Sequence, residues 1–128
     1  MMVPEELRYT PEHEWVLLRE EGTVRVGVTD YAQTQLGDVV YIQLPLLGDP
    51  VKAGQPVGEI ESTKSVSDVF APVDGEVVGL NDALESSPDL VNSDPYGAGW
   101  MIEIKPTQPV AVDSLMIAEE YRALIGEE

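Results

Sequence analysis

The amino-acid sequence predicts a mostly β domain: a flattened barrel with short helices and one C-terminal helix. Short runs of alternating apolar residues, bounded by Gly, Pro and Asp, dominate the 128 residues. A faint echo between 54–61 and 75–81 places a glycine before a short strand on either side of a central hairpin. Two related half-motifs suit a barrel with approximate two-fold symmetry. We expect residues 1–128 to form one domain, with a core over about 9–112.

The first half of the chain predicts three strands and one short helix. In order, these are strands at 14–18 and 23–28, a helix from Asp30 to Leu36, and a strand at 38–44. Thr29 suits the N-cap of the helix, because its hydroxyl can accept a bond from a first-turn N–H. Gly37 suits the left-handed conformation that ends many helices. Pro45, Gly48 and Pro50 then break the chain.

The second half predicts four more strands, which we expect at 56–61, 66–71, 75–80 and 99–105. Asn81 is expected to cap a single helical turn that ends at Leu84. Residues 86–98 are rich in Ser, Pro, Asp and Gly, and this composition predicts a loop.

A helix is predicted at about 114–125, with Asp113 as its N-cap. The apolar residues that recur there at helical spacing are Ile117, Tyr121, Leu124 and Ile125. Such a stripe predicts that one face of the helix packs on the barrel.

The charge of the chain restricts its partners. Its formal net charge is -17, so nucleic acid and anionic membranes would repel it, whereas basic proteins would be attracted. No apolar run approaches the length of a membrane-spanning helix. The start, Met1–Glu6, has neither a basic region nor an apolar run, which argues against a signal peptide. We therefore expect a soluble, cytoplasmic protein.

The residues that usually carry catalysis are scarce. The chain has no cysteine and one histidine, His13, for which a structural or surface role is expected. One histidine among scattered carboxylates predicts no metal site. Phosphate-binding loops and dinucleotide glycine motifs are absent. We therefore expect a protein that is not itself an enzyme.

Lys64 is the most informative residue of the chain. It lies in a polar stretch between two alternating runs, 56–60 and 69–73, which predict a hairpin with Lys64 at its tip. The other two lysines, Lys52 and Lys105, have no strands closing symmetrically around them. A flexible amine on an exposed turn is accessible to a modifying enzyme, so Lys64 is a candidate attachment site for a carried group.

Glu61 and Asp68 bracket Lys64 in the sequence. One interpretation makes them solvated turn residues. The other is that they mark the hairpin for a modifying enzyme and later face the carried group. Spacing leaves both interpretations open.

Several motifs together resemble those of the glycine cleavage system H-protein family, over about Tyr9 to Leu124. They are Tyr9–Trp15, Val28–Gln33, Leu36–Val40, Glu61–Asp68, Ala71–Val77 and Asn92–Ile102. The resemblance implies a hybrid barrel-sandwich domain with lipoate amide-linked to Lys64. It also implies a bacterial, cytoplasmic carrier that takes an aminomethyl group from glycine decarboxylase (P-protein) to aminomethyltransferase (T-protein). Dihydrolipoamide dehydrogenase (L-protein) would reoxidise it, and a lipoylating enzyme would load it.

Glu14 and Asp68 are the carboxylates expected to hold the loaded amine, which is a cation. Replacing either by alanine is expected to speed spontaneous loss of the loaded group, because the parked group would be less shielded from water.

Other carriers and a different class of protein remain as alternatives. Biotinyl domains typically have methionine on both sides of the lysine, whereas Thr63 and Ser65 flank Lys64 here. Lipoyl domains of 2-oxo acid dehydrogenases are usually shorter and joined to Pro/Ala-rich linkers, which this chain lacks. The remaining alternatives are an H-like protein that relays lipoyl groups and an unmodified β scaffold or binding module.

Overall fold

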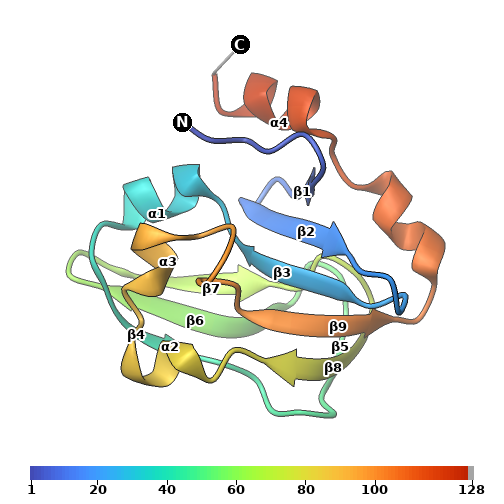
Figure 1. The fold of residues 1–128 in the computed structure, drawn as a ribbon, viewed down its shortest axis with the longest axis horizontal. Helices are drawn as coiled ribbons and strands as arrows, with labels where there is room; N and C mark the ends of the chain where they lie inside the picture. Colours follow the sequence, from blue (N-terminus) through green and yellow to red (C-terminus); the bar gives the residue numbers. More distant parts are fainter. Residues whose placement is uncertain (127–128) are drawn as a thin grey trace.

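The computed structural model describes residues 1–126, in which nine strands form two antiparallel sheets (Figure 1). The six-stranded sheet contains, in spatial order, β1 (Arg8–Tyr9), β2 (Glu14–Leu18), β3 (Val24–Val28), β9 (Ile102–Pro106), β8 (Gly75–Leu80) and β5 (Pro50–Val51). The three-stranded sheet contains β4 (Val39–Gln43), β6 (Pro56–Ser62) and β7 (Val66–Phe70). The predicted mostly β fold with a C-terminal helix is confirmed, although these two sheets do not close into one continuous barrel within the described range.

The core lies between the two sheets, and alternation along the strands builds it. On β3, Val24, Val26 and Val28 are buried, and they are joined by Ile104 of β9. Ile60 of β6 closes the core from the other sheet. Burial of each such side chain stabilises the fold by about 1.5–3 kcal/mol. The two segments of the sequence echo become β6 and β8, one in each sheet.

Helix α1 (Asp30–Leu36) has the predicted bounds and the predicted caps. The Thr29 hydroxyl accepts a hydrogen bond from the Ala32 N–H at 3.2 Å. Gly37 ends the helix with φ of 80°, a backbone conformation that a side chain would strain. Local sequence signals are therefore sufficient for this helix.

The segment between β8 and β9 corrects three predictions. It contains α2 (Ala83–Ser86), which begins two residues after the predicted cap Asn81. The Asn81 side-chain oxygen accepts a bond from the Ala83 N–H at 3.3 Å, while its amide donates to the carbonyls of Ala98 and Trp100, at 2.8 and 2.6 Å. The expected loop contains a second helix, α3 (Leu90–Ser93). Strand β9 starts at Ile102 rather than at residue 99.

The C-terminal helix is shorter than predicted. A 3-10 helix, η1 (Pro109–Ser114), includes the expected cap Asp113, and α4 (Ala118–Leu124) begins only after Ile117. Glu120 fixes this start, because its carboxylate accepts a bond from the Ile117 N–H at 3.0 Å. The buried residues of α4 are Ala118 and Tyr121. Of the predicted apolar face, Ile117 and Leu124 are exposed.

A second apolar cluster joins α4 to the N-terminal segment and β1, which lie side by side at one end of the molecule (Figure 1). Tyr9 and Tyr121 stack in it, with ring centroids 4.6 Å apart and an interplanar angle of 10°. Trp15 of β2 and Leu7 complete its centre. None of the helices within residues 1–126 has the length and apolar character needed to cross a membrane.

Candidate functional site

Lys64 lies in the turn between β6 and β7, and its side chain is exposed. The turn is held by Ser62, whose N–H donates to the Ser65 carbonyl at 2.8 Å. The Ser62 hydroxyl accepts bonds from the N–H groups of Lys64 and Ser65, at 3.2 and 3.1 Å. The backbone of the turn is thus fixed by its neighbours, while the Lys64 amine remains accessible.

The turn packs against the connection between α1 and β4. The Thr63 N–H donates to the Asp38 carbonyl at 3.0 Å. A Cβ added at Gly37 would lie 3.4 Å from Cε of Lys64, so the aliphatic part of the lysine passes directly over this glycine. Besides ending α1, Gly37 therefore leaves the space in which the Lys64 side chain lies.

Asn92, on α3, holds the connection between α1 and β4 through three side-chain hydrogen bonds. Its amide donates to the Gly37 carbonyl at 2.8 Å and to the Gln33 side chain at 3.0 Å. Its carbonyl oxygen accepts a bond from the Val39 N–H at 2.8 Å. Asn92 lies in the segment predicted to be a loop, and no local pattern there predicted this function.

Asn92→Ala is expected to loosen the connection and, with it, the Lys64 turn. Three hydrogen bonds disappear and leave partly buried groups unpaired, which should cost about 2 kcal/mol of unfolding free energy. Hydrogen exchange should accelerate at the amides of Val39 and Thr63. Ser93→Ala, on the same helix but exposed, is the matched control and should change neither quantity. Unchanged exchange in the Asn92 variant would contradict this account.

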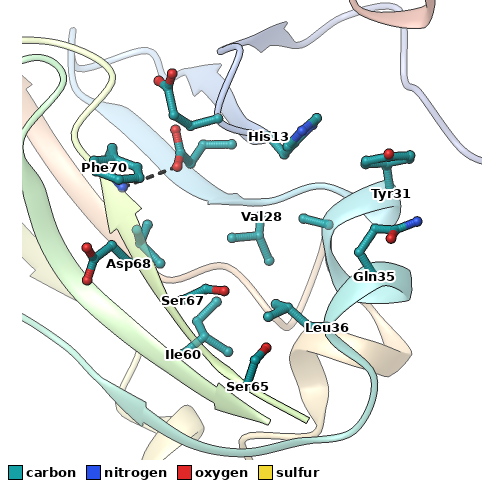
Figure 2. A pocket seen from close by; sticks show the side chains of 14 residues that line it. His13, Val28, Tyr31, Gln35, Leu36, Ile60, Ser65, Ser67, Asp68 and Phe70 are labelled. Atoms are coloured by element: carbon teal, nitrogen blue, oxygen red, sulfur yellow. Dashed lines mark hydrogen bonds between the residues drawn. The ribbon is translucent and has the colours of Figure 1, made fainter. Parts of the chain in front are cut away.

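A cavity of about 500 Å³ opens beside the turn (Figure 2). One side is formed by α1 and another by β7, from Ser65 at the turn to Phe70. The loop between β1 and β2 contributes Glu12, His13 and Glu14. Apolar side chains supply much of the lining, and its carboxylates are those of Glu12, Glu14 and Asp68. A long apolar group with a cationic end would fit such a lining.

Glu14 is 1% exposed although it lines the cavity. Its carboxylate accepts bonds from the Thr10 hydroxyl at 2.5 Å and from the Phe70 N–H at 3.2 Å, the bond drawn in Figure 2. Burial raises the pKa of Glu14 from 4.5 to about 7, while these two hydrogen bonds act to lower it. Glu14 is therefore a poorly solvated carboxylate that would gain from a cationic partner.

Asp68 and Glu61 do not face each other across the hairpin. Asp68 pairs with Glu59 in the register of β6 and β7, whereas Glu61 pairs with Val66. Asp68 is exposed and lines the cavity, but Glu61 does not line it. Of the three carboxylates singled out from the sequence, the structure brings Glu14 and Asp68 to one cavity and leaves Glu61 outside it.

His13 lies at the same cavity, where its ring is tilted against that of Tyr31 at 4.8 Å. Burial lowers the pKa of His13, against the opposite effect of Glu12. No local pattern predicted that His13 would line a cavity. The side chain of Gln35, on α1, was missed for the same reason (Figure 2).

Comparisons with known proteins agree on one family. A family model described as Glycine cleavage H-protein matches residues 7–128. A glycine cleavage system H protein of Mycolicibacterium smegmatis is 55% identical over 128 residues, covering 98% of each chain. One from Anaeromyxobacter sp. (strain K) is 52% identical, covering 100% of this chain and 99% of the relative. The crystal structure of a glycine cleavage system H protein from Mycobacterium marinum is 43% identical with a TM-score of 0.89, covering 97% of this chain and 99% of its own.

Proposed function

This chain belongs to the glycine cleavage H-protein family and is a lipoyl carrier of the glycine cleavage system, and we propose that Lys64 bears the lipoyl group. The observation that carries the proposal is the placement of Lys64 on a rigid, exposed turn whose next residue, Ser65, lines a mainly apolar cavity. Neither Lys52 nor Lys105 lies in a turn between paired strands or next to a residue that lines the cavity.

The cavity fits the lipoyl group in its chemistry. Val28, Leu36, Ile60 and Val69 offer an apolar surface to a hydrocarbon arm. When attached, the group would supply a disulfide, whose opening on loading leaves one sulfur to carry the aminomethyl group and the other as a thiol. Amide formation removes the lysine charge and lengthens the side chain into a rotatable arm. The tether keeps the carried group at a high local concentration near each partner.

The partners follow from the family role. Glycine decarboxylase would load the arm, aminomethyltransferase would unload it, and dihydrolipoamide dehydrogenase would reoxidise the dithiol. A lipoylating enzyme must first acylate Lys64. In this scheme the chain itself catalyses no step, acts in the bacterial cytoplasm, and binds neither nucleic acid nor membrane. Its net charge of -17 supports recognition by basic partner surfaces and predicts that association slows as salt is raised.

Glu14 and Asp68 would hold the loaded amine between these encounters. Glu14 lines the cavity as a buried carboxylate and Asp68 lies on its β7 side. Pairing with an ammonium group would offset the cost of burying the Glu14 charge. Apolar side chains around the carried group would exclude water from it.

Glu14→Ala and Asp68→Ala are expected to speed spontaneous loss of the aminomethyl group from the loaded chain. A charge-assisted contact is worth about 1.5–3 kcal/mol, so the Glu14 variant should lose the group roughly tenfold faster or more. The exposed Asp68 should have a smaller effect. Glu61→Ala is the matched control, because it removes a carboxylate outside the cavity. The decay is followed by intact-mass spectrometry, and equal rates in all four proteins would contradict the holding role.

A loading experiment tests the proposed function. The lipoylated chain, with its arm in the oxidised disulfide form, is incubated with glycine and glycine decarboxylase, and the mass of an aminomethyl group should appear on the arm. Addition of aminomethyltransferase and tetrahydrofolate should remove it. A chain that bears lipoate but is never loaded would instead favour lipoyl relay, and a chain that no lipoylating enzyme modifies would favour a scaffold.

A further inference from the structure

The hydroxyl of Tyr121, on α4, bonds two residues at once. It lies 2.8 Å from Nδ1 of His13 and 2.7 Å from the hydroxyl of Thr29. Tyr121 and Thr29 are both 0% exposed, so the bond between them is shielded from water, and the bond to His13 is partly buried. A hydroxyl can donate one bond and accept others, and it can therefore serve both partners together.

These two partners belong to different sides of the cavity beside Lys64. His13 lines the cavity from the loop between β1 and β2, directly before Glu14. Thr29 caps α1, whose residues Tyr31, Ala32, Gln35 and Leu36 line the cavity from another side. The two sides also meet through a backbone bond from the Thr29 N–H to the His13 carbonyl, at 3.0 Å. Tyr121 adds the side-chain connection between them.

The backbone conformation of His13 makes the hydrogen bond from its side chain to Tyr121 more important. His13 has φ of 73°, and it is the only residue other than glycine with positive φ among the described residues. A positive φ is uncommon for residues other than glycine and costs free energy, which the surrounding contacts must offset. Its side chain is held by the Tyr121 hydroxyl and by the ring of Tyr31.

The position of the Tyr121 ring does not depend on its hydroxyl. The ring stacks on that of Tyr9, whose own hydroxyl donates to the Pro4 carbonyl at 2.7 Å, away from His13 and Thr29. The stacked pair thus offers two hydroxyls in similar apolar surroundings, of which one reaches the cavity residues. This arrangement supplies a matched control.

We propose that Tyr121 is a positioning residue, whose hydroxyl fixes His13 against the start of α1 and so sets the cavity that receives the loaded arm. The proposal extends the function proposed for the cavity and rests on it. It gives the C-terminal helix a part in retaining the carried group, although no residue of α4 lines the cavity itself.

Tyr121→Phe and Tyr9→Phe test the proposal. The first readout is the imidazole ¹⁵N spectrum of the unmodified chain, which is unambiguous because His13 is the only histidine. Tyr121→Phe should shift these signals toward the tautomer mixture of a free imidazole, and Tyr9→Phe should leave them unchanged. The second readout is the decay of the loaded aminomethyl group, which should be about fivefold faster in Tyr121→Phe alone, the effect of one lost hydrogen bond.

Three results would overturn the proposal. An unchanged His13 spectrum in Tyr121→Phe would show that the hydroxyl does not position the ring. A changed spectrum with unchanged decay would separate His13 from the carried group. The same changes in Tyr9→Phe would assign them to packing of the stacked pair. If the unsubstituted chain cannot be lipoylated, the proposed function fails, and the His13 spectrum still decides whether Tyr121 positions the ring.

Discussion

Lys64→Arg is expected to abolish glycine cleavage in a reconstituted system of P-, T- and L-proteins while leaving the fold intact. Arginine keeps the positive charge but cannot take the lipoyl amide. The Lys64 side chain is exposed, and it packs mainly through its stem over Gly37. Unfolding free energy should therefore change by no more than about 0.5 kcal/mol.

Lys52→Arg and Lys105→Arg are the controls for this result. They conserve charge in the same way at the other two lysines, and both should retain full activity. Activity in Lys64→Arg, or its loss in either control, would show that the carried group is attached elsewhere. The circular dichroism spectrum of each variant establishes that the fold is retained.

Glu14→Gln is expected to remove a large pH dependence of stability. Burial raises the pKa of Glu14 to about 7 in the folded chain, from 4.5 when unfolded. The folded state therefore binds the proton more tightly, and ionisation destabilises it progressively as pH rises from about 4.5 to about 7. At roughly 1.4 kcal/mol per pKa unit, the penalty above pH 7 is about 3 kcal/mol.

Glutamine can keep both contacts without the charge. Its carbonyl can accept the Phe70 N–H, and its amide can donate to the Thr10 hydroxyl. The variant should match the parent near pH 4.5 and exceed its stability by about 3 kcal/mol near pH 8. Urea unfolding of both proteins across this range measures the difference. Glu12, His13 and Asp68 face the same cavity, and their effects largely cancel in the comparison.

A stability difference that does not depend on pH would contradict the buried, proton-binding carboxyl. Confirmation of the buried carboxyl would also lead to a prediction about how the chain retains the loaded amine. A carboxylate that is costly in the empty chain gains most from a cationic partner, so retention of the loaded amine should weaken as pH falls below about 7.

Local signals account for the parts of the fold that the sequence predicted well. Thr29 and Gly37 cap α1 through contacts within a few residues, and alternation defines β2, β3 and β6 to within one residue. Such patterns can be read without knowing what packs on them. The turn that carries Lys64 was also predicted from local signals, namely a polar stretch between two alternating runs.

Non-local contacts decide the parts that were mispredicted. Helix α4 starts after Ile117 instead of Asp113 because Met116 pairs with the distant Tyr9 through two backbone hydrogen bonds of 2.9 Å, which hold residue 116 outside the helix. The Asn81 side chain accepts a bond from the Ala83 N–H at the start of α2, but its amide also bonds carbonyls 17 and 19 residues later. The residues that could cap each helix are present in the sequence, but where each helix begins depends also on contacts with distant parts of the chain.

The candidate site likewise contains residues that could be identified from the sequence and residues that could not. Glu14 and Asp68 were singled out from family likeness and charge, and their contact with the carried group remains a prediction, although one cavity contains both. The contributions of Asn92 and Tyr121 depend on partners 53 to 108 residues away. No local sequence pattern predicts contacts between residues so far apart in the chain.

The central claim is that Lys64 carries the lipoyl group, and peptide mass measurement of the protein from its native host tests it most directly. Trypsin cleaves after free lysine but not after acylated lysine, and Pro106 blocks cleavage after Lys105. The account predicts one fragment spanning 53–122 with the added mass of one lipoyl group. Separate, unmodified fragments 53–64 and 65–122, in cells that contain active lipoylating enzymes, would contradict it.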